Sequence, residues 1–548
     1  MRGGKQKKGF TLLEILLVIA AIGILAAIVL IAINPNKQIE AAREAKRKSD
    51  QNAIAKAIQQ YIIERGVYPP ALQGVGVGST VGLCVVAGCS NGIDLSSALS
   101  DYIAGIPIPD RGQYLVTKTV NGVSTGYDNS NILATAAGGT TVAPTLDLNF
   151  ARDKQLTNAV NGTNPISFIR NVLETTPTAT YVDSDGLIKT AAVNAPRFNH
   201  NPVTRESLGL LVEEQRTNLL LQSADLAAST SLNNVAIIAN TIASPDGGIN
   251  ADIVTGSNST SNVKVWAKTA TTSTIGTYTF SVYLKANTQS VILIRIDDAA
   301  GGNGANQLLN LATGQLSGGV TVNGTATAAN ATITNVGNGW YRCSITATLN
   351  SVLTQSNGSV WFDTWGASTS TNSYYAWGAQ LEQGAFATSY IPTTTATVQR
   401  FADSATIIAG TNFNSWYNQL GGTFYGETAN VLGGGATITV RASTDAGERI
   451  QFSNAAAQTA VVSVSAVQAI FGSPGGNKVA LGYAANDFAL KRVGVALETD
   501  SSGVLPTVNM ATVGHYDFGG QERINGSIKR ITYWPTRLSN TVLQSITQ

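Results

Sequence analysis

The sequence contains few of the residues that most often carry charge and covalent chemistry. Charged residues make up 12% of its 548 positions, and there are only two histidines. Histidine-assisted nucleophilic catalysis needs a His near a Ser or Cys, and neither His200 nor His515 lies in a recognisable motif of that kind. The net charge of +2 also argues against strong binding to nucleic acid. We therefore expect a protein that is not an enzyme and has no nucleic-acid partner.

Cysteine is scarce as well, with three residues in the whole chain. Cys84 and Cys89 flank four residues of a glycine-rich loop, and in an exported domain this spacing favours a small disulfide. Two cysteines without a nearby histidine do not favour a zinc site. Cys343 stands alone in a strand-like run, where we expect a buried free thiol.

Long apolar runs are missing too, with one exception near the N-terminus. Residues 10–33 form an apolar stretch of 24 positions, long enough to span about 30 Å of hydrocarbon as a helix. The leader, residues 1–9, is basic and should stay on the cytoplasmic side, so the C-terminal bulk should lie outside. A cleaved signal peptide and a plain membrane anchor are the alternatives, although no small-residue cleavage site follows the stretch.

One acidic side chain, Glu14, interrupts this apolar stretch. A carboxylate at membrane depth costs about 2.5–3.5 kcal/mol even on a lenient insertion scale, so it is tolerated when it has a partner or a role. Neither a signal peptide nor a plain anchor accounts for Glu14 or for the junction of Gly9 with Phe10.

The run Lys8-Gly9-Phe10-Thr11-Leu12-Leu13-Glu14 closely resembles the cleavage and methylation motif of type IV prepilins. The resemblance implies that a prepilin peptidase cuts after Gly9 on the cytoplasmic face and that Phe10 becomes an N-methylated first residue. It also implies that Glu14 pairs with the Phe10 amine of a neighbouring subunit, which neutralises the carboxylate. The implied partners are other pilin subunits, the inner membrane before assembly, and the peptidase.

Helix-forming residues continue from the apolar stretch to Arg65, and Gly66 with two prolines ends the helix. One apolar stripe follows the helical spacing i, i+4, i+7, i+8, and consists of Ile54, Ile58, Tyr61 and Ile62. As in pilins generally, we expect this stripe to pack on a small sheet.

After Arg65 the composition changes. Threonine, serine, asparagine and valine dominate in short alternating runs broken by glycine, which is the pattern of all-β sandwiches. The length predicts about three or four domains. The expected fold class is therefore α+β: a long N-terminal pilin helix with a small head, followed by all-β sandwich domains.

Two further resemblances divide the β-rich part. Residues 145–400 closely resemble a module of phage tail-fibre and virion-surface proteins, with runs such as 278–286 similar to strands of a carbohydrate-binding jelly roll. Residues 525–534 resemble the last strand of concanavalin-like (laminin-G-like) lectin domains. The expected segments are a leader (1–9), a transmembrane and assembly helix (10–65), a pilin head (66–143), a β-rich connecting module (144–215), a jelly roll (216–399) and a lectin-like sandwich (400–548). Whether the segment before the jelly roll folds against the last sandwich is left open.

Sugar sites in such sandwiches combine an aromatic platform with polar side chains, and many displayed copies multiply a modest affinity. Most of the seven tryptophans are expected in the core. Trp361 and Trp365, with Asp363 between them, are the candidate glycan-binding residues. Four carboxylates suit a structural calcium ion by oxygen ligation, although acids near sheet rims are usually just solvated: Asp297, Asp298, Asp363 and Glu382. No other cofactor is expected.

These features together predict a type IV pilin-like subunit. It begins as a membrane-inserted precursor and ends in an extracellular pilus at the cell surface, where its C-terminal modules adhere to surface glycans. Three alternatives stay open: a major structural pilin with an inert β sheath, a type II secretion pseudopilin, and a phage fibre with an accidental apolar N-terminus.

Overall fold

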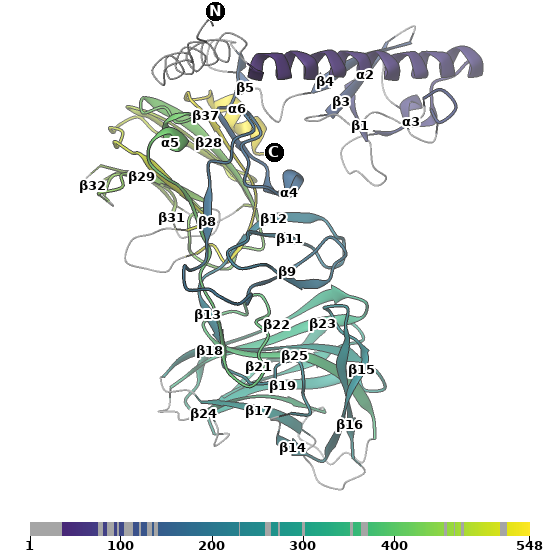
Figure 1. Ribbon diagram of the computed structural model, residues 1–548, viewed down its shortest axis with the longest axis vertical. Helices are drawn as coiled ribbons and strands as arrows, with labels where there is room; N and C mark the ends of the chain where they lie inside the picture. The colour runs from purple at the N-terminus through teal and green to yellow at the C-terminus, as the bar shows by residue number, and fades with distance from the viewer. Residues whose placement is uncertain are drawn as a thin grey trace, which may run out of the picture. The chain divides into compact units, whose positions relative to one another are not determined.

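The computed structural model describes residues 35–74, 80–84, 93–95, 98–103, 113–119, 122–128, 134–135, 141–228, 231–257, 265–271, 275–298, 302–350, 355–362, 371–445, 447–453, 458–464, 466–472, 476–515 and 523–548. The chain forms two compact units, Met1–Ala134 and Thr135–Gln548. A long helix comes first, and nearly all later elements are antiparallel strands (Figure 1). The α+β fold class, with β-sandwiches after the helix, is confirmed.

The first unit packs a helix on a small sheet. Its elements are α2 (Pro35–Arg65), α3 (Pro70–Gln73), β1 (Thr80–Cys84), β2 (Ile93–Asp94), β3 (Gln113–Thr119) and β4 (Gly122–Asp128). The strand order is β2-β1-β3-β4, in which β1 and β2 run parallel and the other pairs run antiparallel. No helix among the described residues combines the length and apolar content that a bilayer crossing requires. Residues 10–33 lie outside the described part.

The apolar stripe on α2 packs as its spacing predicts. Ile54 and Ile58 are fully buried against Leu83, Tyr114 and Val116 of the sheet. The Tyr114 hydroxyl also donates a hydrogen bond of 2.6 Å to a carboxylate oxygen of Asp50 on the helix. Helical stability of this kind comes mainly from packing one apolar face, so these contacts fix how the helix lies on the sheet.

The second unit contains a sandwich, here called the outer sandwich, built of two antiparallel sheets. One sheet has the order β11-β12-β37-β28-β33-β34-β35, and β7 pairs with β37 beside this path. Its strands are β7 (Leu146–Leu148), β11 (Arg197–His200), β12 (Ser207–Val212), β28 (Gly421–Ala429), β33 (Lys478–Ala484), β34 (Asp487–Arg492), β35 (Glu498–Asp500) and β37 (Gly526–Trp534).

The facing sheet has the order β32-β31-β30-β29-β36-β27-β8. Its strands are β8 (Ser167–Ile169), β27 (Ser404–Ile407), β29 (Ile438–Arg441), β30 (Arg449–Phe452), β31 (Gln458–Val464), β32 (Ala466–Gly472) and β36 (Met510–Val513). The short helices α4 (Phe150–Asp153), α5 (Thr411–Asn414) and α6 (Asn540–Ile546) complete this sandwich. An apolar core between the sheets includes Phe424, Phe452, Tyr483 and Tyr533.

Segment 144–215, expected as a connecting module, supplies β7, β8, β11 and β12 to these two sheets. In Figure 1 the blue strand β8 lies beside the green strands of the C-terminal part. β12, for example, pairs with β37, so that Leu210 lies opposite Ile528. The segment before the jelly roll therefore folds as part of the sandwich that residues 400–548 complete. Strands of three to six residues carry too little periodicity for the sequence to show this.

The jelly roll consists of two six-stranded antiparallel sheets. The first contains, in order, β14 (Ser231–Asn233), β17 (Val265–Thr271), β24 (Gln355–Trp361), β19 (Val291–Asp298), β20 (Gly304–Asn310) and β21 (Gln315–Asn323). The second contains β15 (Val235–Ala243), β16 (Ile249–Gly256), β25 (Ser373–Gln383), β18 (Gly276–Ala286), β23 (Trp340–Leu349) and β22 (Thr327–Gly337). Cross-strand threonine pairs such as Thr279 with Thr346, 2.7 Å apart, stabilise the second sheet.

Three two-stranded ribbons lie outside these sheets: β5 (Ala134–Thr135) with β6 (Thr141–Val142), β9 (Thr180–Val182) with β10 (Ile188–Thr190), and β13 (Arg216–Asn218) with β26 (Val398–Arg400). The last ribbon matters most for the site. β13 leads the chain from the outer sandwich into the jelly roll and β26 leads it back, and the two pair antiparallel. The jelly roll is therefore an insertion in the outer sandwich, held by a ribbon at its base.

Candidate ligand-binding site

The residues predicted to take part in processing and assembly lie outside the described residues. These are Gly9, Phe10 and Glu14, together with Cys89 of the expected disulfide. Cys84 ends β1. The expected free thiol is confirmed: Cys343 is buried and unpaired, and burial raises its pKa.

Of the candidate glycan residues, Asp363 and Trp365 also lie outside the described part, whereas Trp361 ends β24 and is half-buried. Its Nε1 donates a hydrogen bond of 2.9 Å to the Ser359 hydroxyl. The guanidinium carbon of Arg295 lies 5.8 Å from the centre of its ring. One ring face is thus already in a cation–π contact, and glycan binding there stays a prediction. Four other tryptophans are buried, as expected of core residues: Trp340, Trp377, Trp416 and Trp534.

Among the described residues, the carboxylates that were considered as calcium ligands interact with groups of the protein itself. Asp298 accepts hydrogen bonds from the backbone of Gly302 at 2.9 Å and from the Asn303 amide at 2.6 Å. Glu382 accepts from the Thr388 backbone at 2.8 Å and from its hydroxyl at 2.7 Å. Within the part of the chain that the structure describes, no group of three or more His, Cys, Asp or Glu side chains could hold a metal ion.

A buried cluster of charges lies at the base of the jelly roll. Its members are Arg170, Glu174, Arg197, Glu213, Arg400 and Asp403, here called the base cluster, three cations and three anions. Arg197 bonds Glu213 at 2.7 Å and also pairs with Asp403, while Arg400 pairs with Glu213 as well. Arg400 ends β26, and Glu213 lies shortly before β13. The base cluster therefore joins the β13–β26 ribbon to the outer sandwich.

Glu213 is the centre of the base cluster. Burial alone would raise its pKa, but Arg400, Arg197 and two hydrogen bonds from Ser389 outweigh that effect and hold the pKa well below its usual range. The backbone N–H and the hydroxyl of Ser389 each donate at 2.7 Å. Because Ser389 follows the last jelly-roll strand, these bonds attach the jelly roll to the cluster.

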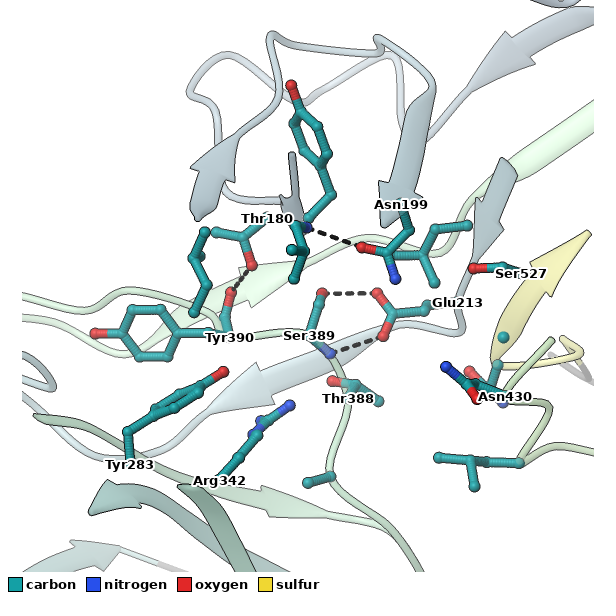
Figure 2. A pocket seen from close by; sticks show the side chains of 18 residues that line it. Thr180, Asn199, Glu213, Tyr283, Arg342, Thr388, Ser389, Tyr390, Asn430 and Ser527 are labelled. Carbon is teal, nitrogen blue, oxygen red and sulfur yellow. Dashed lines mark hydrogen bonds between the residues drawn. The ribbon is translucent and has the colours of Figure 1, made fainter. Parts of the chain in front are cut away.

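A pocket of about 210 Å³ opens beside the base cluster. Its walls come from β9, β11 and β12 on one side, from β18 and β23 of the jelly roll on another, and from β37 and the segment after β28 on a third. Figure 2 shows Tyr283, Arg342, Asn199, Ser527 and Asn430 around it. Residues more than three hundred positions apart thus line one cavity.

Tyr283 and Arg342 form one wall of the pocket. The Arg342 guanidinium carbon lies 5.4 Å from the centre of the Tyr283 ring, and its Nη2 donates to the Ser281 hydroxyl at 3.1 Å. Its Nε is buried and lacks a hydrogen-bond acceptor among the described residues. Burial raises the pKa of the Tyr283 hydroxyl, which therefore stays a neutral donor.

The opposite walls carry neutral polar groups. Asn199 accepts a bond of 2.8 Å from the Val182 backbone through its oxygen, which leaves its amide nitrogen able to donate. Asn430 is exposed and Ser527 is buried, and both line the pocket. The lining carboxylate, Glu213, is held by two arginines, so the pocket offers neutral hydrogen-bonding groups and the cation of Arg342.

No local sequence pattern predicts this pocket. Two of its tyrosines, Tyr181 and Tyr283, lie within strands and a third, Tyr390, lies in a loop, and no local motif joins them to Asn199 or Ser527. The local feature that marks the position is Arg342, a cation within an otherwise uncharged strand.

Comparison with known proteins concerns mainly the N-terminal region. The model of the prokaryotic N-terminal methylation motif matches residues 4–30, which confirms the resemblance to the prepilin motif. Type II secretion system core protein G of Escherichia coli K12 is 40% identical over 75 residues, covering 14% of this chain and 50% of that protein. The protein of the same name from Pseudomonas aeruginosa is 37% identical over 71 residues, covering 13% and 49%. The chain spans about half the length of the curated relatives it matches.

Among solved structures, the mouse laminin alpha1 chain, domains LG4-5, matches 63% of this chain and 92% of its own at 10% identity, with a TM-score of 0.15. That TM-score is too low to assign a fold, and the sandwich architecture rests on the strand pairings. The resemblance of residues 145–400 to phage tail-fibre modules stays a prediction.

Proposed function

We propose that this chain is a subunit of a pilin-like or pseudopilin-like filament that displays large β-sandwich domains. A prepilin peptidase cuts the membrane-inserted precursor after Gly9, and Phe10 is then methylated. The N-terminal helix assembles with those of other subunits, and Glu14 pairs with the Phe10 amine of a neighbour. The observation that carries this proposal is the methylation motif matched at residues 4–30.

Two further observations support the proposal. The N-terminal region is similar to core protein G of type II secretion systems. In the described part, α2 packs its apolar stripe on a four-stranded sheet, the arrangement that the pilin resemblance leads one to expect.

Processing can be tested by expressing the chain with and without a prepilin peptidase and analysing its N-terminus by mass spectrometry. We expect a mature chain that begins with N-methylphenylalanine at position 10. A Gly9→Val variant should stay uncut, and Gly4→Val in the same leader is the matched control that should still be cut. A wild-type chain that keeps its leader in the presence of an active peptidase would refute the proposal.

For the displayed domains we propose adhesion to surface glycans. The support is the pocket at the base of the jelly roll, where a tyrosine ring, amides and a hydroxyl face one cavity. Neutral groups that both donate and accept suit polyhydroxylated ligands. Filaments or full-length protein in detergent should bind some glycans of a glycan array. If no glycan on the array is bound, the proposed adhesive role of the β domains is wrong.

A secretion pseudopilin is the second candidate, favoured by the similarity to core protein G. The accessibility of the β domains to protease on intact cells distinguishes a pilus subunit from a pseudopilin. Protease added to intact cells should cut the β domains of a surface pilus subunit, whereas domains of a pseudopilus that stays in the periplasm should be protected.

A further inference from the structure

Arg342 is a cation that lacks an anionic partner within the described chain. It forms no ion pair there, and its one hydrogen bond goes to the neutral Ser281. The arginines of the base cluster differ, since Arg197 and Arg400 each pair with Glu213. A half-buried guanidinium without an anionic partner costs free energy. An anionic ligand in the pocket that Arg342 lines would supply that partner.

The surroundings of Arg342 define the rest of the ligand. Tyr283 lines the pocket beside the guanidinium, and its ring is packed against Trp377 and Tyr390. Asn199, Asn430 and Ser527 offer neutral donors and acceptors from other walls (Figure 2). A volume of about 210 Å³ is smaller than the roughly 300–1,000 Å³ of pockets for drug-sized molecules, so the pocket suits one small ring.

We propose that this pocket binds the acidic ring of a saccharide, a hexuronate whose carboxylate is held by Arg342. Charge-assisted bonds from a guanidinium to a carboxylate are about twice as strong as neutral ones and can be bidentate. The ring lies against Tyr283, and its hydroxyl groups bond Asn199, Asn430 and Ser527. This assignment rests on the proposed glycan adhesion and names its ligand class.

The test titrates full-length protein in detergent with methyl β-D-glucuronide and with the neutral methyl β-D-glucoside. The wild type should bind the glucuronide about tenfold or more tightly, since a hydrogen bond to a charged group contributes about 1.5–3 kcal/mol. R342Q should remove this preference and R342K should keep part of it. R205Q changes an exposed arginine that does not line the pocket and should bind both sugars as the wild type does.

Asn430 provides a variant with little risk to folding, because its side chain is exposed and its φ of 52° suits glycine. N430G should weaken the binding of both sugars by a similar factor while leaving the preference for the glucuronide intact. Equal binding of the two sugars by the wild type, or an unchanged preference in R342Q, would overturn the proposal. If R342Q still binds the same array glycans as the wild type, the assigned pocket is wrong but adhesion stands. If the wild type binds no saccharide at all, both proposals fail.

Discussion

Glu14 is the residue on which assembly should depend most directly. Replacing it by Gln removes the charge with little change in size, so an incoming Phe10 amine would lack its anionic partner in the membrane. We expect E14Q to be cut and to appear in sheared filaments at about one tenth of the wild-type amount or less. Immunoblots of sheared fractions measure this, with E40Q outside the apolar stretch as the control. Wild-type levels of E14Q in filaments would contradict the electrostatic pairing.

Asp297 is a second residue with a measurable consequence. Burial raises the pKa of its carboxyl group to about 6, and the negative charge of the adjacent Asp298 acts in the same direction. Arg295 and a hydrogen bond with Asn357 act in the opposite direction but do not outweigh burial. The folded state therefore holds the proton more tightly than the unfolded state does. As the pH rises from about 4 to 6, the unfolded chain ionises first, so this residue's contribution to stability falls.

The corresponding experiment compares wild type with D297N by denaturant unfolding at several pH values. The free energy of unfolding of the wild type relative to D297N should decrease by about 2–3 kcal/mol between pH 4 and pH 7, at about 1.4 kcal/mol per pKa unit. A difference that does not change over this range would show that burial does not perturb Asp297.

At the scale of elements, the base cluster decides how the β13–β26 ribbon is held. E213Q would leave Arg197 and Arg400 buried without their shared carboxylate, and removing one partner of a buried pair costs about 3–5 kcal/mol. E206Q is the matched control, because Glu206 pairs with Lys529 but its side chain is 61% exposed. An exposed pair contributes at most about 1 kcal/mol.

Both variants can be followed by circular dichroism during urea unfolding of the full chain. E213Q should unfold at clearly lower urea than E206Q, and R197M combined with E213Q should cost less than the sum of the two single changes because the sites are coupled. Equal midpoints for E213Q and E206Q would mean that the base cluster contributes little to stability.

At the scale of the whole molecule, the jelly roll is an insertion in the outer sandwich. We therefore expect that the jelly roll can be removed without unfolding the outer sandwich, whereas the C-terminal part of the outer sandwich cannot be removed. Asn218 and Val398 lie opposite each other in the β13–β26 ribbon, so a short Gly-Ser linker can replace residues 219–397. We expect the shortened chain to keep a folded outer sandwich, because its sheets contain no strand from the removed part. Deleting 400–548 should instead leave β7 and β8 without partners and the β11–β12 pair without its neighbour β37.

Limited proteolysis with mass spectrometry distinguishes these chains. The chain without 219–397 should yield a protease-resistant core that contains both 141–218 and 398–548. In the other deletion, residues 141–215 should be digested. Rapid digestion of the outer sandwich after removal of the jelly roll would show that the insertion is needed for its folding.

The sequence by itself determined the N-terminal motif, the extent of the helix to Arg65, its buried stripe and the change to β-sandwiches. Each of these depends on residues close together in the chain, where spacing and composition are direct physical signals. Tertiary structure alone decided that 144–215 completes the outer sandwich and that Asn199, Arg342 and Ser527 meet at one pocket. Short strands are paired by the burial of whole sheets, and β37, with which both β7 and β12 pair, lies more than three hundred residues away, beyond the reach of any local pattern.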